Sequence, residues 1–194
     1  MLVFYHAPGS SSMAVHIALH EVGAMFEGRT ISLTGRDQDQ PAFRGINPEG
    51  KVPTLLIDGR VLTEVAGILY YLARLYPDAK LFPVGDIEAE AQVVSWMSFI
   101  ASTLHPARRQ GREHAHAVYR LADQRLGDRM WAVGEAYSIA DIHLFRLFWR
   151  LRGSLGAEPA MFPNLSAHYD RMMDRPAVRK TFEAEAALGY NLLA

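Results

Sequence analysis

The spacing of hydrophobic and polar positions changes several times in the first half of the chain. An apolar run over residues 2–5 predicts a strand, and apolar residues at helical spacing over 13–22 predict a helix that ends at Gly23. Alternating positions over 26–33 predict a second strand, and the polar stretch 35–45 predicts a loop with a short helix. We therefore expect the chain to begin with a strand, a helix, a strand and a short helix.

A hairpin and a further helix follow in the pattern. The apolar segments 52–57 and 60–62 flank Asp58-Gly59, a pair that tolerates positive φ and favours a tight hairpin turn. Residues 64–76 then place their apolar side chains on one helical face, and residues 77–86, with two prolines and a glycine, resemble a linker.

Beyond the linker, every segment has helical spacing. The expected helices are a long one from Ile87 to about Arg112 that bends near Pro106, then 113–129, then Ile139–Arg152, and two shorter ones that start near Pro163 and Pro176. The change from mixed segments to helices alone predicts two domains, over residues 1–77 and 85–194. The expected fold class is therefore an α/β domain followed by an all-α domain.

Composition narrows the classes of function. Of the 194 residues, 49% are hydrophobic and 21% are charged, and the net charge of −1 gives no general attraction to nucleic acid or to an anionic membrane. The chain has no cysteine, which excludes disulfides, thiolate metal ligands and a catalytic thiol. No apolar run approaches the roughly 20 residues that span a bilayer, and no signal peptide is evident. We expect a cytoplasmic protein without nucleic-acid or membrane partners.

Two features of the first domain indicate a ligand site, although each also has a structural explanation. Ser10, Ser11 and Ser12 lie where the first strand meets the first helix, so they either cap the helix or contact a ligand. Pro53 precedes a strand, and a cis bond after Val52 would expose the Val52 N–H and C=O to a peptide-like ligand; the alternative is an ordinary turn proline.

Glu64 is a third such feature, because it opens an apolar helix. An acidic residue there is favoured by the helix dipole alone. The alternative is a carboxylate that pairs with a ligand ammonium group, while the N–H groups of Val65 and Ala66 receive a ligand carboxylate.

These features, in this order, resemble the glutathione transferase family. The motifs that carry the resemblance are NPEGKVPTL at 47–55, LTE at 62–64 before an apolar helix, and YLARLYP at 71–77. The resemblance covers the whole chain and implies a thioredoxin-like N-terminal domain followed by an all-helical C-terminal domain. It also implies glutathione as co-substrate without a metal, an apolar electrophilic small molecule as second substrate, and a homodimer.

A second signature lies in the helical part. The segment YSIADIHLF at 137–145 resembles the family's buried capping segment, in which Ser138 caps the helix and Asp141 reaches back to free backbone donors. We interpret both residues as structural.

Within the family, the bacterial beta class is the nearest pattern. Its members have PG-x-C-S-x-A-x-H after the first strand, and residues 8–16 here are PGSSSMAVH, so Ser11 stands at the position of the cysteine. The class motif IA-x-x-LH matches residues 100–105, and the resemblance therefore places His105 near the sulfur or the substrate. A serine cannot form a mixed disulfide, but its hydroxyl can donate a hydrogen bond to the glutathione sulfur and favour the thiolate.

Other assignments for the sulfur contact stay open. Ser10, Ser12 or the phenol of Tyr5, at the end of the first strand, could donate instead of Ser11. A serine-rich helix cap without any catalytic part is the structural alternative.

The resemblance also assigns the other contacts to glutathione. Val52, beside Pro53, would pair with the cysteinyl backbone, Glu64 with the γ-glutamyl ammonium, and the N–H of Val65 with the γ-glutamyl carboxylate. Val65 occupies a place where relatives often have serine or glycine.

Three further candidates are either ligand contacts or solvated surface residues. Lys51 and Arg36 are candidates for the glycyl carboxylate, and Ser98 would reach toward the ligand of a neighbouring subunit. Trp96 and Phe99 are expected to line the pocket for the electrophile.

We expect an enzyme that conjugates glutathione to electrophiles. The loss of the cysteine leaves two alternatives, a glutathione-binding protein without turnover and a structural or interaction module with this fold. A metal site is not expected, because His114 and His116 lack a carboxylate or cysteine at ligand spacing.

Overall fold

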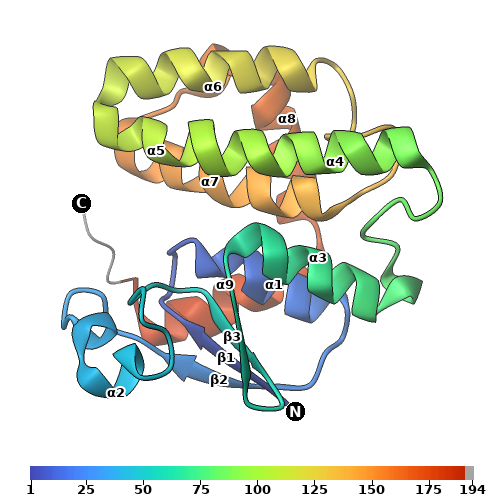
Figure 1. Ribbon diagram of the computed structural model, residues 1–194. Helices are drawn as coiled ribbons and strands as arrows, with labels where there is room; N and C mark the ends of the chain where they lie inside the picture. Colours follow the sequence, from blue (N-terminus) through green and yellow to red (C-terminus); the bar gives the residue numbers. More distant parts are fainter. Residues whose placement is uncertain (191–194) are drawn as a thin grey trace. The chain divides into compact units, whose positions relative to one another are not determined.

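The computed structural model describes residues 1–190, which form two units (Figure 1). One unit contains residues 1–75 and the segment from Pro176 onward, and the other contains residues 76–175. The division expected from the sequence, 1–77 and 85–194, assigned the C-terminal segment to the helical domain. It belongs with the first unit because helix α9 (Pro176–Leu188) packs against helix α1 (Ser12–Glu21).

The first unit is built on a sheet of four strands in the order β2-β1-β3-β4. The strands are β1 (Leu2–His6), β2 (Phe26–Thr30), β3 (Thr54–Ile57) and β4 (Arg60–Thr63). β1 pairs with β2 in parallel and with β3 antiparallel, and β3 and β4 form the predicted hairpin. Asp58 and Gly59 have φ values of 49° and 83°, as its two-residue turn requires.

β1 is the central strand that positions the site, and all of its residues are buried. On one face, Val3 and Tyr5 pack with Phe43 of the short helix α2 (Pro41–Arg44). On the other face, Phe4 lies against His16 of α1, with ring centroids 5.7 Å apart. A strand covered on both faces needs a continuous apolar run, which explains its sequence.

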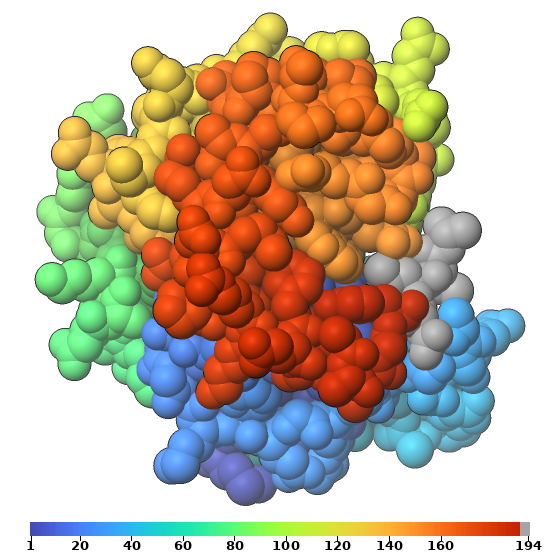
Figure 2. All heavy atoms as spheres, turned by 180° about the vertical axis from the view of Figure 1, so that it is seen from behind, coloured from blue at the N-terminus to red at the C-terminus, as the bar shows by residue number. Residues whose placement is uncertain are grey.

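Helices α1, α3 (Val65–Leu75) and α9 pack beside the sheet, with α1 in contact with both of the others (Figure 1). Figure 2 shows the red atoms of α9 at the surface, beside blue atoms of the N-terminal part of the chain. The segment expected to be a loop with a short helix contains α2 and the 3-10 turn η1 (Asp37–Asp39).

The second unit is helical throughout, as expected. Its elements are η2 (Pro77–Ala79), α4 (Ile87–Phe99), α5 (His105–Ala107), η4 (Arg108–Gln110), α6 (Arg112–Leu126), α7 (Ile139–Leu155), η5 (Pro159–Met161) and α8 (Pro163–Met173). α7 is the central helix, since it contacts α4 and α8 and is buried on all sides from Ile139 to Phe148. None of the helices in the described part of the chain combines the length and apolar character needed to cross a bilayer.

The long helix expected from Ile87 is irregular near Pro106. Between α4 and α5 the backbone forms a π-helical turn, η3 (Ile100–Leu104). Pro106 has no N–H to donate to the carbonyl one turn earlier, and a widened turn is one way in which a helix accommodates this loss. The helical path ends at Gly111, whose φ is 97°.

The start of α7 has the capping arrangement expected from its sequence. Ser138 Oγ accepts from the Ala140 N–H at 3.3 Å, and Asp141 Oδ2 accepts from the Ser138 N–H at 2.9 Å. Asp141 Oδ1 also accepts from the Ala132 N–H at 2.7 Å and lies 3.0 Å from His168 Nε2. The structural interpretation of Ser138 and Asp141 agrees with these contacts.

Candidate functional site

The turn between β1 and α1 carries the three serines. The Ser10 N–H donates to the Ala7 carbonyl at 3.0 Å, and Gly9 has a φ of 73°, which glycine adopts without strain. The Gly9 N–H donates to Glu185 Oε2 at 2.6 Å. The turn is thereby tied to α9, although 176 residues separate the two partners in sequence.

Two of the three serines donate their hydroxyl hydrogens within the turn itself. Ser12 Oγ donates to the Ala7 carbonyl at 3.0 Å and accepts from the Ala7 N–H at 3.1 Å. Since Ser12 has then spent its one hydroxyl hydrogen, Ser10 is the donor in the 2.7 Å contact between the two hydroxyls. Both side chains are buried, and together they hold the turn in shape.

Ser11 differs from both neighbours. It is half-buried, and its hydroxyl does not cap α1 but donates to the Val52 carbonyl at 3.0 Å. Among residues 1–190, none accepts a hydrogen bond from the Ser11 N–H. Ser11 therefore presents two donors, an N–H and an O–H, directly beside Val52.

The loop that carries Val52 is held by a buried amide. Asn47 Nδ2 donates to the Lys51 carbonyl and to Thr54 Oγ1, each at 2.9 Å, and Asn47 Oδ1 accepts from the Glu49 N–H at 3.0 Å. The peptide bond between Val52 and Pro53 is cis.

Glu64 stands at the start of α3 in an unusual conformation. Its φ is 67°, a left-handed value that is uncommon for a residue with a side chain, and such values concentrate at functional sites. Its carbonyl accepts from the Ile68 N–H at 3.0 Å, while its side chain is exposed. The N–H groups of Val65 and Ala66 belong to the first turn, where an α-helix offers them no internal acceptor. A carboxylate and two donors therefore lie close together at this helix end.

Three other predicted residues of the first unit have partners of their own. The Tyr5 hydroxyl accepts from Arg29 Nη1 at 2.8 Å, and its ring packs against Phe43. Arg36 is exposed and donates through Nε to Asp39 at 2.9 Å. Lys51 is exposed too, with its Nζ 3.6 Å from Glu49.

The remaining predicted residues lie in the second unit. Ser98 is exposed on α4, and its carbonyl accepts from Ser102 Oγ at 2.8 Å. Burial, and then the charges of Arg146, Arg109 and Arg108, lower the pKa of His105 to about 4, so its imidazole is neutral at neutral pH.

The expected role of Trp96 in an electrophile pocket is wrong. Its side chain is buried, its indole N–H donates to the Ala132 carbonyl at 2.8 Å, and the guanidinium of Arg125 lies 4.3 Å from its ring centroid. Phe99 is half-buried next to it, with ring centroids 6.0 Å apart. Trp96 is a core residue of the helical unit.

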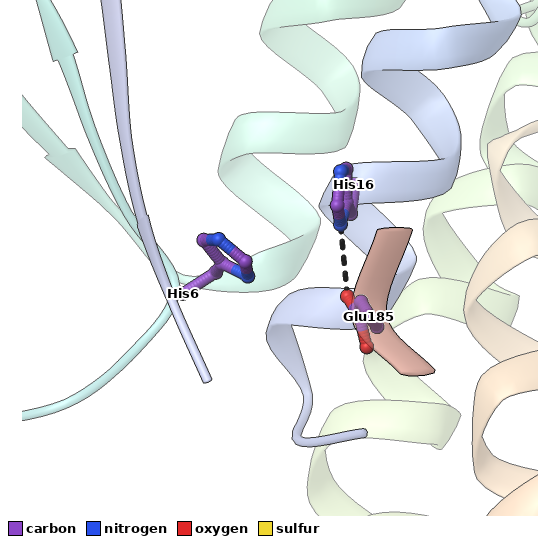
Figure 3. Close-up of side chains that lie close together, drawn as sticks. All are labelled: His6, His16 and Glu185. Atoms are coloured by element: carbon purple, nitrogen blue, oxygen red, sulfur yellow. Dashed lines mark hydrogen bonds and ion pairs between the residues drawn. The ribbon is translucent and has the colours of Figure 1, made fainter. Parts of the chain in front are cut away.

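Figure 3 shows a buried polar cluster, in which His6 of β1, His16 of α1 and Glu185 of α9 lie together. Their potential ligand atoms are all within 4.8 Å of one another, the only such group of three among the described residues. His16 Nδ1 lies 2.9 Å from Glu185 Oε1, and the second carboxylate oxygen is used by Gly9. Both oxygens of Glu185 thus already have protein partners, and the cluster joins β1, α1 and α9.

Sequence reasoning missed Glu185 and the arginines around His105. A signal for Glu185 is present in α9, where the buried residues Ala177, Thr181 and Glu185 recur at a spacing of four. A buried acidic residue in such a stripe needs a buried hydrogen-bonding partner, but the sequence does not identify His16 as that partner.

Two family models match the chain. The model described as the glutathione S-transferase N-terminal domain matches residues 4–80, and the one described as the glutathione S-transferase C-terminal domain matches residues 87–176.

Curated proteins and solved structures are similar over almost the whole length. Glutathione S-transferase GstA of Escherichia coli O157:H7 is 32% identical, with 95% of this chain and 98% of that protein covered. The structure of a sphingomonad glutathione S-transferase complexed with glutathione is 32% identical, with a TM-score of 0.86 and 95% and 98% coverage. That of the bacterial beta class enzyme from Sphingomonas chungbukensis is 32% identical, with a TM-score of 0.84 and 94% and 98% coverage.

Proposed function

Because the chain belongs to the glutathione S-transferase family, we propose that it joins the sulfur of glutathione to electrophilic small molecules, with Ser11 stabilising the thiolate. The observation that supports the role of Ser11 is a difference in hydrogen bonding among the three serines. Ser10 and Ser12 spend their hydroxyl hydrogens inside the turn, whereas Ser11 keeps an N–H and a rotatable O–H at its surface.

The thiolate would be stabilised by these two donors. A hydroxyl that rotates away from the Val52 carbonyl can donate to sulfur, and hydrogen bonds to the charged form lower a thiol pKa. The Val52 carbonyl then becomes available to the cysteinyl N–H of glutathione. Binding therefore replaces the hydrogen bond between Ser11 and Val52 with two others, one from Ser11 to the sulfur and one from glutathione to Val52. This exchange makes the contact between Ser11 and Val52 compatible with catalysis.

The rest of glutathione would bind at the two neighbouring elements. The Val52 N–H and C=O, held by the Asn47 loop, are suited to pair with the cysteinyl backbone. The Glu64 carboxylate would receive the γ-glutamyl ammonium, and the N–H of Val65 at the start of α3 would receive the γ-glutamyl carboxylate. The glycyl carboxylate would meet Lys51 or Arg36, which are both exposed; the ion pair of Lys51 with Glu49 is the longer one, at 3.6 Å against 2.9 Å between Arg36 and Asp39.

Three further parts of the proposal come from the resemblance to the beta class. His105 would contact the sulfur or the substrate, and its neutral state suits a hydrogen-bond acceptor or donor rather than a fixed charge. The protein would act as a cytoplasmic homodimer, with Ser98 near the glutathione of the partner subunit.

The chemical step needs only the activated sulfur. The thiol proton passes to solvent when the thiolate forms. The thiolate then attacks an electrophilic carbon, the new C–S bond forms, and a leaving group such as chloride departs with the electron pair of its bond.

The test measures glutathione binding and the conjugation of chlorodinitrobenzene in the same preparations. The wild type should bind glutathione and form the thioether, and Ser11→Ala should lower kcat/KM by about a hundredfold, as expected for loss of a donor to a developing anion. Ser12→Ala is the contrasting variant. It should lower the free energy of unfolding by about 1–3 kcal/mol, because it leaves the Ala7 N–H without its acceptor and removes one of the two donors to the Ala7 carbonyl.

The alternatives give different results. Binding of glutathione without conjugation of any electrophile would identify a binding protein, and no binding at all would identify a structural module. An unchanged kcat/KM in Ser11→Ala would contradict the assigned role of this serine.

A further inference from the structure

The buried cluster of His6, His16 and Glu185 contains a nitrogen that the fold leaves without a hydrogen bond. Glu185 accepts from the Gly9 N–H through Oε2, and its Oε1 lies 2.9 Å from His16 Nδ1. His6 Nδ1 has no partner among residues 1–190, although His6 is only 4% exposed. An unpaired buried nitrogen is unfavourable, and a bound ligand would remove this cost.

The unpaired nitrogen lies on the side of the His6 ring that faces the rest of the cluster. Nε2 of His6 lies beside Gly28 of β2, 3.6 Å from the position that a Cβ would occupy there. The other ring nitrogen, Nδ1, is turned toward His16 and Glu185 (Figure 3). The cluster therefore directs two imidazole nitrogens and one carboxylate oxygen toward a common space.

The spacing of these three atoms is close to the one that a metal ion requires. All three lie within 4.8 Å of one another. Zinc binds imidazole nitrogen and carboxylate oxygen at about 2.0–2.2 Å, which puts two ligands of a tetrahedral site about 3.3 Å apart. His16 Nδ1 and Glu185 Oε1 are already closer than this, at 2.9 Å. A small rotation of the His6 ring, which no hydrogen bond at Nδ1 opposes, would bring the third ligand into place.

The types of ligand atom select the metal. Two imidazoles with one carboxylate are a set that zinc binds in proteins, whereas magnesium and calcium prefer oxygen ligands alone. The carboxylate of Glu185 offsets part of the charge of the ion. His16 is 5% exposed and Glu185 is fully buried, so the cluster suits an ion with a structural role, whose fourth ligand is a water molecule.

We propose that His6, His16 and Glu185 bind a zinc ion that holds α9 against β1 and α1. The ion would be bound by His6 Nδ1, His16 Nδ1 and Glu185 Oε1, and it would replace the proton between His16 and Glu185. Because Glu185 Oε2 accepts from the Gly9 N–H, the ion would also steady the turn that carries the three serines.

The zinc site is independent of the proposed transferase reaction, which uses no metal. The expectation that no metal site is present concerned His114 and His116, which belong to the other unit. The three ligands proposed here come from three elements that only the fold brings together.

The first experiment measures zinc binding to the full-length protein, prepared without a histidine tag and freed of metal with a chelator. Zinc chloride is titrated calorimetrically into the wild type, His6→Leu and His114→Leu, with magnesium chloride as the comparison ion. His6→Leu removes one ligand and leaves the contact between His16 and Glu185 in place. His114→Leu, at an exposed position of the other unit, is the matched control for zinc held by surface histidines.

The wild type and His114→Leu should bind one zinc ion each and no magnesium. The affinity of His6→Leu for zinc should be lower by about a hundredfold or more, because even the loss of a residue that only orients a ligand costs tenfold to a hundredfold. Zinc at about a hundred times its Kd should raise the Tm of the wild type by about 5–10 °C, and that of His6→Leu by much less. Equal zinc affinity in the wild type and in His6→Leu would overturn the site.

The second experiment locates the ion without any substitution, so it decides the question even if His6→Leu does not fold. Crystals of the wild type are grown with zinc, and anomalous scattering is recorded at the zinc edge. A peak between His6, His16 and Glu185 is expected. Zinc found only at surface positions such as His114 would overturn the site.

Conjugation of chlorodinitrobenzene, measured in the same preparations, separates this proposal from the proposed function. Conjugation by a protein that binds no zinc at the cluster would overturn the zinc site alone. Zinc at the cluster of a protein without conjugating activity would overturn the proposed function alone.

Discussion

The first unit places His6 and His16 beside the carboxylate of Glu185, with His20 next to His16, whereas the second unit gathers His105 and four arginines around a cavity whose lining contains no carboxylate. In the first cluster, His16 lies 2.9 Å from Glu185 Oε1, and His20 Nδ1 lies 3.0 Å from Thr181 Oγ1 on the same helix. His16 and His20 therefore have hydrogen-bond partners within the first unit, whereas His6 Nδ1 has none among the described residues.

The two clusters differ in composition, because only the first has an acidic residue among its members. In the first unit, Glu185 supplies the carboxylate, and the cluster joins β1, α1 and α9. In the second unit, the residues that line the cavity include four arginines from the α4–α5 path and α7, and no acidic residue is among them. The predictions below change one side of this comparison at a time.

The largest effect is expected from Glu185→Ala. This substitution removes the partner of His16 and of the Gly9 N–H inside the protein, and breaking a buried pair from one side typically costs about 3–5 kcal/mol. Urea unfolding should report this loss. Glu183→Ala, at an exposed position two residues earlier in α9, should change the stability by less than about 0.5 kcal/mol. Similar values for the two variants would contradict the structural role of the cluster.

Acid should destabilise both clusters. Burial and the charge of His16 lower the pKa of His6 from 6.5 to about 4, and burial together with the nearby arginines lowers that of His105 to about 4. Between these values the unfolded chain binds protons that the folded chain does not, so stability falls as the pH falls.

His6 and His105 should therefore each lower the free energy of unfolding by about 2 kcal/mol between about pH 7 and pH 5, measured by urea titration at each pH. His6→Leu should make this fall smaller, whereas His114→Leu, at an exposed position, should not. A fall of the same size in the wild type and in His6→Leu would show that His6 is not its source.

The smallest effect is expected from His143→Leu, which removes one basic group next to His105. Neither ring nitrogen of the buried His143 has a hydrogen-bond partner among residues 1–190, and burial lowers its pKa to about 3. An apolar residue of similar size should raise the free energy of unfolding by about 1 kcal/mol at neutral pH. His168→Leu should have the opposite sign, because His168 is bonded to Asp141. Destabilisation by His143→Leu would indicate a polar partner that the structure does not describe.

The sequence predicted the local structure well. Periodicity identified the strands and most helices, and Asp58-Gly59 identified the hairpin, because these signals depend on neighbours in the chain. The place of α9 could not be predicted in this way. Its helical spacing was evident, but its contact with α1 depends on Glu185 meeting His16, across 169 residues of sequence.

The candidate site shows the same limit. The motif around Ser11 and the one around Val52 could be located separately, and the structure brings them to 3.0 Å. Which serine has a hydroxyl to offer follows from hydrogen-bond partners, which a sequence does not display. The basic cavity was missed because Arg108 and Arg146 come from helical segments that only the fold brings together.

The most direct test of the account is the thiol pKa of glutathione bound to the protein, measured from the ultraviolet absorbance of the thiolate at saturating glutathione. In the wild type we predict a value at least about one unit below the 8.5 or so of a free thiol, and in Ser11→Ala a rise of about one unit from the wild-type value. An identical thiol pKa in the two proteins would contradict the claim that Ser11 stabilises the thiolate.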